Sequence, residues 1–599
     1  MKNFFTSFFG AIIGVVLAMV ICTLLFISSI VGMFGGLREA LGEDGGPKKE
    51  VKANSVLFVD FKRPISDRTI DNPFANFNFS GMGEEGLGLD KIVENIKKAK
   101  EDSAIKGIYL NLTELNAGIA TVEEIRNTLL DFKTSKKFIY AYSEVYSQKT
   151  YYLASVSDKV YLNPQGMLEF KGLSAQIMFY KKALDNYNIE MQIFRHGKFK
   201  SAIEPFMLDK MSEANRLQTE VFMGSIWNSI LTGISKQRGV TIDELNRIAD
   251  NLVLKNQKDA VALKLVDALL YEDEVHDEIR KKVSIAADKK INFVKLADYN
   301  SEDKKPFNVK KKEKAGDKIA VIYAVGSIES GEGDDNTIGS DRIARAIKEA
   351  RLDSTVKAIV LRVNSPGGSA LASDVMWREV LLAKKAKPFI VSMGDVAASG
   401  GYYISCAADK IYAQPNTITG SIGVFGMMPN AQKLLAEKIG INIDTVNTNK
   451  HSDIGTIFRP VTEEERIYIQ KGVEDVYDVF TKRVAEGRKM TQANVDSIGQ
   501  GRVWSGTDAL KIKLVDELGG LDKAIAYAAE KANLKTYKTV ELPKQKNTLE
   551  AILGKAEDEA ETKMMAKNLG ENYKYIQHLR NLIRMKGVQA RLPFEFIIN

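Results

Sequence analysis

Residues 151–164 read YYLASVSDKVYLNP, and residues 402–415 read YYISCAADKIYAQP. The two stretches lie 251 positions apart. Flanking segments repeat in the same order, as IKGIYL (105–110) and VKAIVL (356–361) upstream and as DAVALKLVD (259–267) and DALKIKLVD (508–516) downstream. Solenoid proteins repeat with much shorter periods of about 20–50 residues. The chain therefore contains one large domain twice.

The two copies differ in the loops where a catalytic group would lie. NSPGGS at 364–369 in the second copy corresponds to TELNAG at 113–118 in the first. AASGG at 397–401 corresponds to YSQKT at 146–150. A shared scaffold with divergent glycine loops indicates that one copy kept a chemistry that the other lost.

Length and charge limit the classes of function. A chain of 599 residues is long enough for two large domains and an appendage. The net charge of +7 is mild for this size, and the basic run at 304–314 lies between the copies. We interpret this run as a solvated linker, and we expect no nucleic-acid partner. Cys22 and Cys406 are the two cysteines, and their positions make an internal disulfide implausible.

The N-terminus is typical of a transmembrane helix. No charged side chain lies between Lys2 and Arg38, and residues 8–31 are almost wholly apolar. About 20 apolar residues span the hydrocarbon core of a bilayer, whereas the apolar region of a cleavable signal peptide has about 7–15. We therefore expect a retained anchor. Cleavage near Ser28 and Ser29 is the alternative, and the flanking charges do not settle the orientation.

Both copies are predicted to have α/β architecture. Strands are expected at 55–61, 105–112, 318–324, 356–363 and 388–393. Helices are expected at 121–133, 372–386 and 402–408, and long ones from about Ser212 and Thr462. Thr462 and Glu465 have the spacing of a capping box. Strands that alternate with helices indicate an α/β fold.

These features divide the chain into six segments. They are a membrane anchor (1–36), a tether (37–53), a first repeat (54–300), a basic linker (301–317), a second repeat (318–545) and a C-terminal helical tail (546–599). The tail is charged and helix-prone, and its sequence indicates no function.

Ser399 is the candidate nucleophile. It stands between a strand and a helix, where a tight turn exposes a serine among backbone N–H groups that have no partner within the helix. Together with the helix dipole, such groups stabilise an oxyanion. Gly367 and Gly368 offer a second donor, because glycine lets a substrate approach the backbone closely. Each motif alone is also consistent with a close-packed helix start or a turn. The joint loss of both from the first copy favours catalysis.

The base that activates this serine has two possible identities. His196 and His451 both follow the central repeat motif, so a Ser–His–Asp triad is open. A lysine kept neutral by burial is the other option, and its pKa must fall from about 10.4 toward about 7–8.

Lys200 is the strongest candidate among the lysines. When the copies are aligned, Lys200 falls opposite Ser452, whereas Lys198 falls opposite Lys450. Lys200 is thus lost from the copy that kept the serine. It also precedes the apolar run SAIEPF at 201–206.

Four motifs together resemble the long, duplicated signal peptide peptidases of the S49 family of serine proteases. They are NSPGGS (364–369), AASGGYY (397–403), TGSIGV (419–424) and GKFKSAIEPF (197–206). The resemblance extends from the anchor through the second repeat. It implies tandem ClpP/crotonase-like domains behind an N-terminal transmembrane helix.

The resemblance also implies roles for particular residues. Ser399 would be the nucleophile, Lys200 from the other copy the general base, and Ser421 the residue that orients the lysine. Gly367, Gly368 and Gly400 would form the oxyanion site. No metal or cofactor is implied.

The resemblance further implies a membrane-anchored homotetramer on the periplasmic face of the bacterial inner membrane. Its substrates would be the remnants of signal peptides and other short or unfolded peptides. Asp395 and Val396 occupy positions that are usually small or apolar in the family, a departure that could alter the substrate groove but not the dyad. Two alternatives remain, a crotonase-like acyl-CoA enzyme and a catalytically inactive membrane scaffold.

Overall fold

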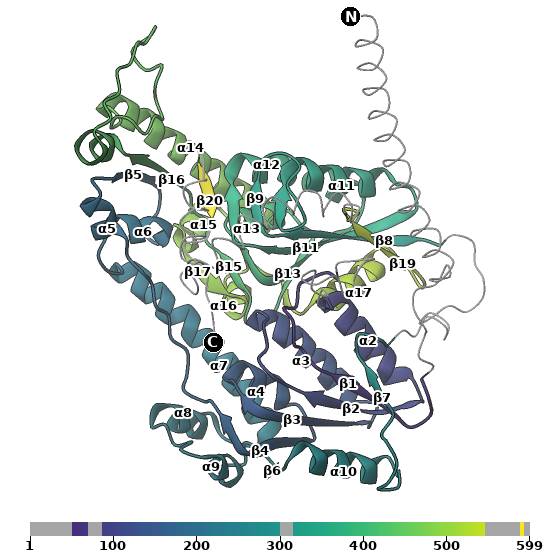
Figure 1. Ribbon diagram of the computed structural model, residues 1–599. Coiled ribbons are helices and arrows are strands. Elements are labelled where there is room, and N and C mark those ends of the chain that lie inside the picture. The colour runs from purple at the N-terminus through teal and green to yellow at the C-terminus, as the bar shows by residue number, and fades with distance from the viewer. Residues whose placement is uncertain (1–50, 70–86, 300–315, 546–587, 592–599) are drawn as a thin grey trace, which may run out of the picture.

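The computed structural model describes residues 51–69, 87–299, 316–545 and 588–591 (Figure 1). Four features of the sequence lie outside the described residues. They are the predicted membrane anchor, the basic run at 304–314, Cys22 and most of the tail. Within the described ranges, no helix is both long enough and apolar enough to cross a bilayer. Cys406 is buried and has no disulfide partner.

The first copy forms a six-stranded sheet in the order β6-β4-β3-β2-β1-β7. Its strands are β1 (Ser55–Val59), β2 (Ile105–Asn111), β3 (Phe138–Tyr146), β4 (Lys159–Leu168), β6 (Ala268–Leu269) and β7 (Phe293–Lys295). All neighbouring strands run parallel. Helices cover both faces of such a sheet, which explains why β1 and β2 are apolar along most of their length.

The second copy repeats this topology. Its main strands are β8 (Lys318–Val325), β11 (Val356–Ser365), β13 (Phe389–Ala398), β14 (Lys410–Ala413), β15 (Ile418–Gly420), β17 (Val503–Ser505), β18 (Glu517–Leu518) and β19 (Lys538–Leu542). The order is β17-β15-β13-β11-β8-β19, and β14 pairs with β13 and β18. The series β19-β8-β11-β13-β14-β18 matches β7-β1-β2-β3-β4-β6. The internal repeat of the sequence is thus a repeat of the fold.

The helices also correspond between the copies. Those of the first copy are α2 (Leu89–Glu101), α3 (Ile119–Lys133), α4 (Gln148–Ala154), α7 (Glu213–Arg238), α8 (Ile242–Asp250), α9 (Gln257–Ala262) and α10 (Glu272–Lys282). Those of the second are α11 (Ser340–Leu352), α12 (Ala370–Ala386), α13 (Gly400–Ser405), α14 (Glu463–Arg488), α15 (Gln492–Ile498), α16 (Gly506–Lys511) and α17 (Leu521–Lys531). The predicted capping box of Thr462 and Glu465 is confirmed. Ser212 caps α7 in the same way, by accepting a hydrogen bond from the Asn215 amide.

A third sheet joins the two copies. Its order is β10-β9-β12-β20-β16-β5. The strands are β5 (Glu190–Arg195) from the first copy, β9 (Ser327–Glu329), β10 (Thr337–Gly339), β12 (Gly367–Ser369) and β16 (Phe425–Asn430) from the second, and β20 (Gln589–Arg591) from the tail. Strand β5 pairs antiparallel with β16 along six residues. The chain then continues into the short helices η1 (Ser201–Ile203) and α6 (Glu204–Met207), so Lys200 is carried into the second copy.

A buried ion cluster also connects the copies. Arg362 of β11 donates to Asp67 at 2.7 Å and to Glu124 of α3 at 3.1 Å, and all three side chains are nearly inaccessible to solvent. The second oxygen of Glu124 accepts the Leu521 amide of the second copy at 2.7 Å. Removing one partner of a buried ion cluster leaves the others charged in a low dielectric, which costs much more than losing an exposed pair.

We therefore predict that Arg362→Met destabilises the folded protein by about 3–5 kcal/mol, because Asp67 and Glu124 lose their cation. The matched control is Arg345→Met. The side chain of Arg345 is 54% exposed and pairs with an exposed Glu332, so its loss should cost less than about 1 kcal/mol. Urea unfolding of both variants, followed by circular dichroism, measures the difference. Equal effects would show that the cluster does not hold the copies together.

Candidate active site

Ser399 lies in a strained turn between β13 and α13. Its backbone has φ 55° and ψ −113°, a conformation that residues other than glycine rarely adopt. The turn is held because the Ser399 amide donates to the Gly420 carbonyl at 2.8 Å and the Tyr403 amide donates to the Ser399 carbonyl at 2.8 Å. A non-glycine residue held in such a conformation is typical of functional sites.

Lys200 reaches Ser399 from the first copy. Its Nζ lies 2.9 Å from Ser399 Oγ, 3.1 Å from Ser421 Oγ and 3.2 Å from the Ser421 carbonyl oxygen. All three residues are 0% exposed. The structure thus brings together the candidate nucleophile, the candidate base and the serine that the family resemblance indicated, from segments 199 and 221 positions apart.

The partners of Lys200 suit a neutral amine. A neutral amine has two N–H groups and one lone pair. The Ser421 carbonyl oxygen can only accept, and Ser421 Oγ lies 3.3 Å from the Gly501 carbonyl, to which it donates. Both oxygens of Ser421 are therefore available to accept the two N–H groups. The Ser399 hydroxyl donates to the Gly423 carbonyl at 3.4 Å in this structure, and the lone pair of Lys200 accepts its proton when the hydroxyl turns toward the amine.

Burial lowers the pKa of Lys200 well below its ordinary value of 10.5, because a buried ammonium loses its hydration. No opposing contribution from a carboxylate accompanies this shift. The site therefore favours the neutral amine, which is the form that can accept a proton.

Close packing fixes the backbone of Lys200. A Cβ on Gly501, whose φ is +83°, would lie 2.6 Å from the Lys200 amide nitrogen, so only glycine fits there. Gln218 of α7 donates to the Phe199 carbonyl at 3.1 Å and accepts the Val503 amide of the second copy at 3.2 Å. Buried Glu204 accepts hydrogen bonds from the Ser212 and Asn215 side chains. These contacts explain why Lys200 stands in the SAIEPF context.

The candidate oxyanion glycines lie next to Ser399. Gly367 has φ +94°, and a Cβ there would lie 2.7 Å from the Gly400 amide nitrogen. The Gly367 amide donates to Ser365 Oγ at 3.1 Å, so its hydrogen is already used. Gly400 is the first residue of α13, where an amide has no acceptor within the helix. The amides of Gly368 and Gly400 are therefore the better candidates for the oxyanion donors.

The alternative bases lie elsewhere. The ring of His196 stacks on Tyr477 with centroids 4.0 Å apart. His451 contacts Glu465 at 2.9 Å and Glu464 at 3.3 Å, at the start of α14. Neither histidine is among the hydrogen-bond partners of Ser399 in the part of the chain that the structure describes. The geometry offers no histidine triad at Ser399.

Asp395 connects the two copies. It is buried, and it accepts hydrogen bonds from the Thr121 amide at 2.9 Å and the Thr121 hydroxyl at 2.6 Å. The carboxylate thus caps the first turn of α3 in the other copy. The Asp395 carboxylate is thus used to join the copies, and an effect of Asp395 on the substrate groove stays a prediction. Arg362 was missed too, although an arginine in an otherwise apolar strand signals buried carboxylates nearby.

A glutamine takes the place of Ser399 in the first copy. Gln148 stands opposite Ser399 in the repeat, and its side chain accepts the Lys171 and Gly172 amides at 2.6 and 2.7 Å. Ser147 is an ordinary helix cap with φ −67°. The strained turn and the candidate nucleophile are therefore features of the second copy.

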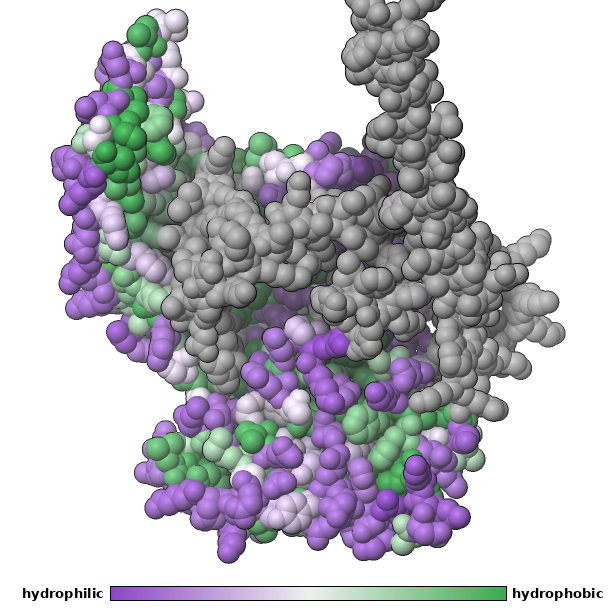
Figure 2. Space-filling view, viewed as in Figure 1, coloured by the Kyte–Doolittle hydropathy of each residue, from purple (hydrophilic) through white to green (hydrophobic). Residues whose placement is uncertain are grey.

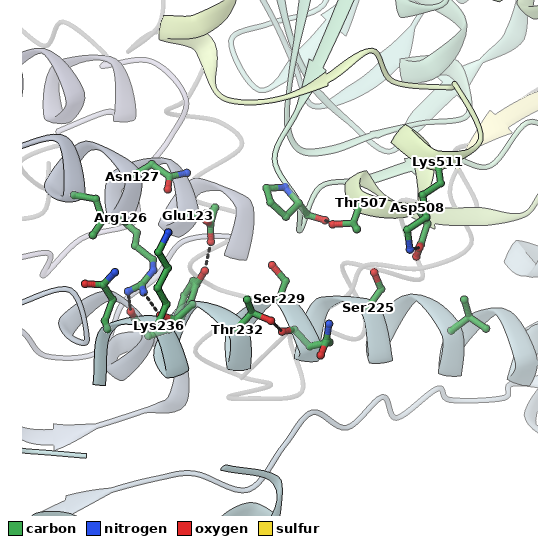
Figure 3. Close-up of a pocket in the computed structure, with 17 residues that line it drawn as sticks. Glu123, Arg126, Asn127, Ser225, Ser229, Thr232, Lys236, Thr507, Asp508 and Lys511 are labelled. Atoms are coloured by element: carbon green, nitrogen blue, oxygen red, sulfur yellow. Dashed lines mark hydrogen bonds and ion pairs between the residues drawn. The ribbon is translucent and has the colours of Figure 1, made fainter. Parts of the chain in front are cut away.

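A separate pocket of about 610 Å³ lies between α3, α7 and α16 (Figure 3). Arg126 in its wall donates to the Tyr152 and Gly233 carbonyls at 2.6 and 2.7 Å and to Ser155 Oγ at 2.8 Å. The residues of the dyad do not line this pocket. Because the buried Arg126 guanidinium already donates to these three oxygens, we assign this pocket a structural role.

Comparison with known proteins places these features in a family. The model of Peptidase family S49 matches residues 131–286 and 382–535, one segment in each copy. Protease 4 of Salmonella typhi is 38% identical over 511 residues, which cover 82% of this chain and 81% of that protein. Serine protease SPPA, chloroplastic, of Arabidopsis thaliana is 35% identical over 85% of this chain and 74% of that protein. Protease 4 of Haemophilus influenzae is 36% identical over 74% of this chain and 72% of that protein.

The lowered pKa of Lys200 predicts a pH dependence for the dyad. Since only the neutral amine accepts the Ser399 proton, kcat/KM for a peptide should rise with pH through the lowered pKa and then level off. The profile should be measured from about pH 5 to about pH 10. A maximum near about pH 5 would indicate a carboxylate base and would contradict this assignment.

Proposed function

This chain belongs to peptidase family S49, and on that premise we propose that it is a serine endopeptidase with a Ser399–Lys200 dyad. The observation that carries the proposal is the 2.9 Å contact between Lys200 Nζ and Ser399 Oγ at a site without solvent exposure. The base and the nucleophile come from different copies, so neither copy is a complete enzyme.

The proposed reaction has two halves. Neutral Lys200 takes the proton of Ser399 Oγ, which attacks the carbonyl carbon of a peptide bond. The amides of Gly368 and Gly400 hold the negative oxygen of the tetrahedral intermediate. The leaving amine then takes the proton from Lys200, and an ester with Ser399 remains. Lys200 next removes a proton from water, and the hydroxide attacks the ester carbonyl. The bond to Ser399 Oγ then breaks, and this oxygen takes the proton back from Lys200, which restores both groups.

Ser421 has the role of a positioning residue in this mechanism. Its two oxygens accept the N–H groups of Lys200, which directs the lone pair toward Ser399. Ser421 has φ 49°, and its amide donates to the Arg502 carbonyl at 2.7 Å. The strained backbone turns both the carbonyl and the hydroxyl of one residue toward the lysine.

We propose short or unfolded peptides as substrates, in particular the remnants of cleaved signal peptides. The resemblance of the four motifs to signal peptide peptidases supports this substrate class. A folded protein would have to present an extended segment to a nucleophile with no solvent exposure. The α/β topology shared by the two copies, with its six matching parallel strands, supports a ClpP/crotonase-like fold. The intact Ser/Lys pair argues against an inactive scaffold.

We further propose that the protein is a homotetramer. The segment between β16 and α14 extends away from the body of the molecule, and Figure 2 shows hydrophobic residues gathered there. Val446 is 97% exposed, and Ile439 and Ile441 are about half exposed. Exposed apolar residues in such number on one segment are typical of an interface between proteins.

The remaining proposal is a location in the bacterial inner membrane with the catalytic copies on the periplasmic side. The membrane location rests on the apolar stretch from residue 8 to residue 31, and the periplasmic side rests on the resemblance of the four motifs to signal peptide peptidases. Native mass spectrometry of the detergent-solubilised protein should give four chains, each retaining its N-terminus. Chains that begin between Ser28 and Leu37 would contradict a retained anchor, and a monomer would contradict the tetramer.

The dyad makes a sharp prediction for substitutions. Ser399→Ala and Lys200→Ala should each lower kcat/KM for a peptide by about 10³-fold or more. The double variant should be barely worse, because either loss already disables the step. Lys200→Arg should be as inactive as Lys200→Ala, because arginine does not give up its proton in proteins. Ser421→Ala should cost less than loss of either dyad member.

Three control substitutions separate the dyad from a triad. His196→Ala, His451→Ala and Lys450→Ala should keep most of the activity, and thermal unfolding should show that all variants fold. Lys450 is a matched control because its ion pair with Glu464 is exposed. Substantial activity in Lys200→Ala, together with its loss in either histidine variant, would replace the dyad with a histidine-based triad.

A further inference from the structure

Lys200 is the central residue of a tight backbone turn. Its φ of −76° and ψ of 80° are close to those of an inverse γ-turn, and the Ser201 amide donates to the Phe199 carbonyl across the turn at 2.8 Å. The Phe199 amide donates to the Gln500 carbonyl of the second copy at 3.0 Å. The direction in which the Lys200 side chain leaves the backbone therefore depends on how this turn is held.

One buried side-chain amide holds both flanks of the turn. The Nε2 atom of Gln218, on α7, lies 3.1 Å from the Phe199 carbonyl oxygen and 2.9 Å from Ser201 Oγ. The Oε1 atom of the same side chain accepts the Val503 amide at 3.2 Å. Because a backbone amide can only donate, this contact fixes which end of the glutamine faces the turn. Gln218 is 1% exposed, and it joins the turn to the loop at 500–503 of the second copy.

The loop that Gln218 binds also sets the position of Ser421. The Gly501 carbonyl accepts the Ser421 hydroxyl at 3.3 Å, and the Arg502 carbonyl accepts the Ser421 amide at 2.7 Å. Ser421 in turn supplies two of the three oxygens that form hydrogen bonds with Lys200 Nζ. Gln218 is therefore bonded both to the segment that carries the base and to the loop that orients it.

A buried carboxylate docks the base segment on the same helix. Glu204 is 0% exposed, and it accepts the Ser212 amide at 3.1 Å and the Asn215 side chain at 3.0 Å. In α14 of the second copy, the corresponding N-cap amide of Thr462 is accepted by Glu465 of the helix itself, at 2.8 Å. Glu204 thus takes the place of the capping-box carboxylate, and the start of α7 is bonded to the segment that carries the base.

The second copy has a different residue at the place of this glutamine. Ser212 and Thr462 are the N-caps of α7 and α14, and aligning them places Gln218 opposite Tyr468. Tyr468 is 74% exposed. The copy without the base thus has a solvent-exposed residue where the copy with the base has a buried amide. This difference indicates that Gln218 serves the base rather than the helix.

Three charged side chains lie near the turn. Glu204 is bonded to the start of α7, and Arg502 and Lys198 lie over the Phe199 ring, 5.1 and 5.2 Å from its centroid. None of the three contributes to the lowered pKa of Lys200, whose cause is burial. Loosening the turn would admit water to the amine, and the pKa of Lys200 would then return toward its ordinary value.

We propose that Gln218 is a positioning residue of the reaction, whose amide sets the contact of Lys200 with Ser399 by fixing the lysine turn against the loop at 500–503. This inference rests on the proposed peptidase function. The glutamine binds the backbone around the base rather than the reacting atoms, so its loss should lower kcat and leave KM nearly unchanged. Misplacing a catalytic group by about 1 Å can lower a rate about 100-fold.

Gln218→Met tests the proposal, because methionine has about the length of glutamine but no amide. The value of kcat for a peptide should fall about 10–100-fold, and the rising limb of the pH profile should move to higher pH. Gln148→Met is the matched control, because Gln148 is a buried glutamine of the first copy that also binds backbone amides. It should leave kcat per folded chain and the pH profile unchanged. Thermal unfolding gives the folded fraction of each variant.

Gln218→Glu keeps the shape of the side chain and is the second variant. Its carboxylate can accept the Val503 amide but has no hydrogen for the Phe199 carbonyl, and its charge favours the ammonium form of Lys200. Since only the neutral amine is active, the rising limb should move further to higher pH than in Gln218→Met. If Gln218→Met does not fold, the same measurements on Gln218→Glu decide.

A carbon-13 NMR titration of Lys200 measures the same effect without a substrate. The pKa of Lys200 should be higher in Gln218→Met than in Gln148→Met. Unchanged kcat and an unshifted pH profile in folded Gln218→Met would overturn the proposal, and so would an equal fall in kcat per folded chain in Gln148→Met. If the wild-type chain hydrolyses no peptide, the proposed function fails, and the lysine titration alone decides whether Gln218 positions the lysine.

Discussion

A lysine buried without a carboxylate partner is the constraint on which the active site depends. Lys200 is fully buried, and among the described residues its Nζ forms hydrogen bonds only with the oxygens of Ser399 and Ser421. An ammonium in that setting is unfavourable, so burial selects the neutral amine. A histidine needs no such shift to act near neutral pH, whereas a lysine needs a dry and rigid site. The tight fit of Gly501 against the Lys200 backbone supplies that rigidity.

The division of the dyad between two copies makes catalysis depend on how the copies pack. Strand β5 places Lys200 in the second copy, while Arg362, Asp67 and Glu124 fix the central sheets against each other. Each copy has therefore lost what the other supplies. Gln148 fills the site opposite Ser399, and the segment opposite Lys200 has become an exposed arm. Duplication followed by loss of complementary parts explains why one fold occurs twice with different loops.

Much of this architecture follows from local sequence signals. The alternation of apolar strands with capped helices predicted both α/β copies, and the glycine loops predicted the turn at Ser399. Contacts between segments far apart in the chain were not predictable in this way. The contact of Asp395 with Thr121 was missed because the two residues lie 274 positions apart, and nothing in the local sequence of either reveals the other. The strand at 589–591 is three residues long and gains its partners only from β12 and β16, so its sequence looked like part of a helical tail.

The central claim is that Lys200 is neutral at the pH at which the enzyme works. The most direct test is a carbon-13 NMR titration of the lysine ε-carbons, with the Lys200 resonance assigned by its absence in Lys200→Met. We predict that this resonance titrates well below the ordinary lysine pKa of 10.5, while those of exposed lysines do not shift. A Lys200 resonance that titrates together with the exposed lysines would contradict the account, because an ammonium cannot accept the proton of Ser399.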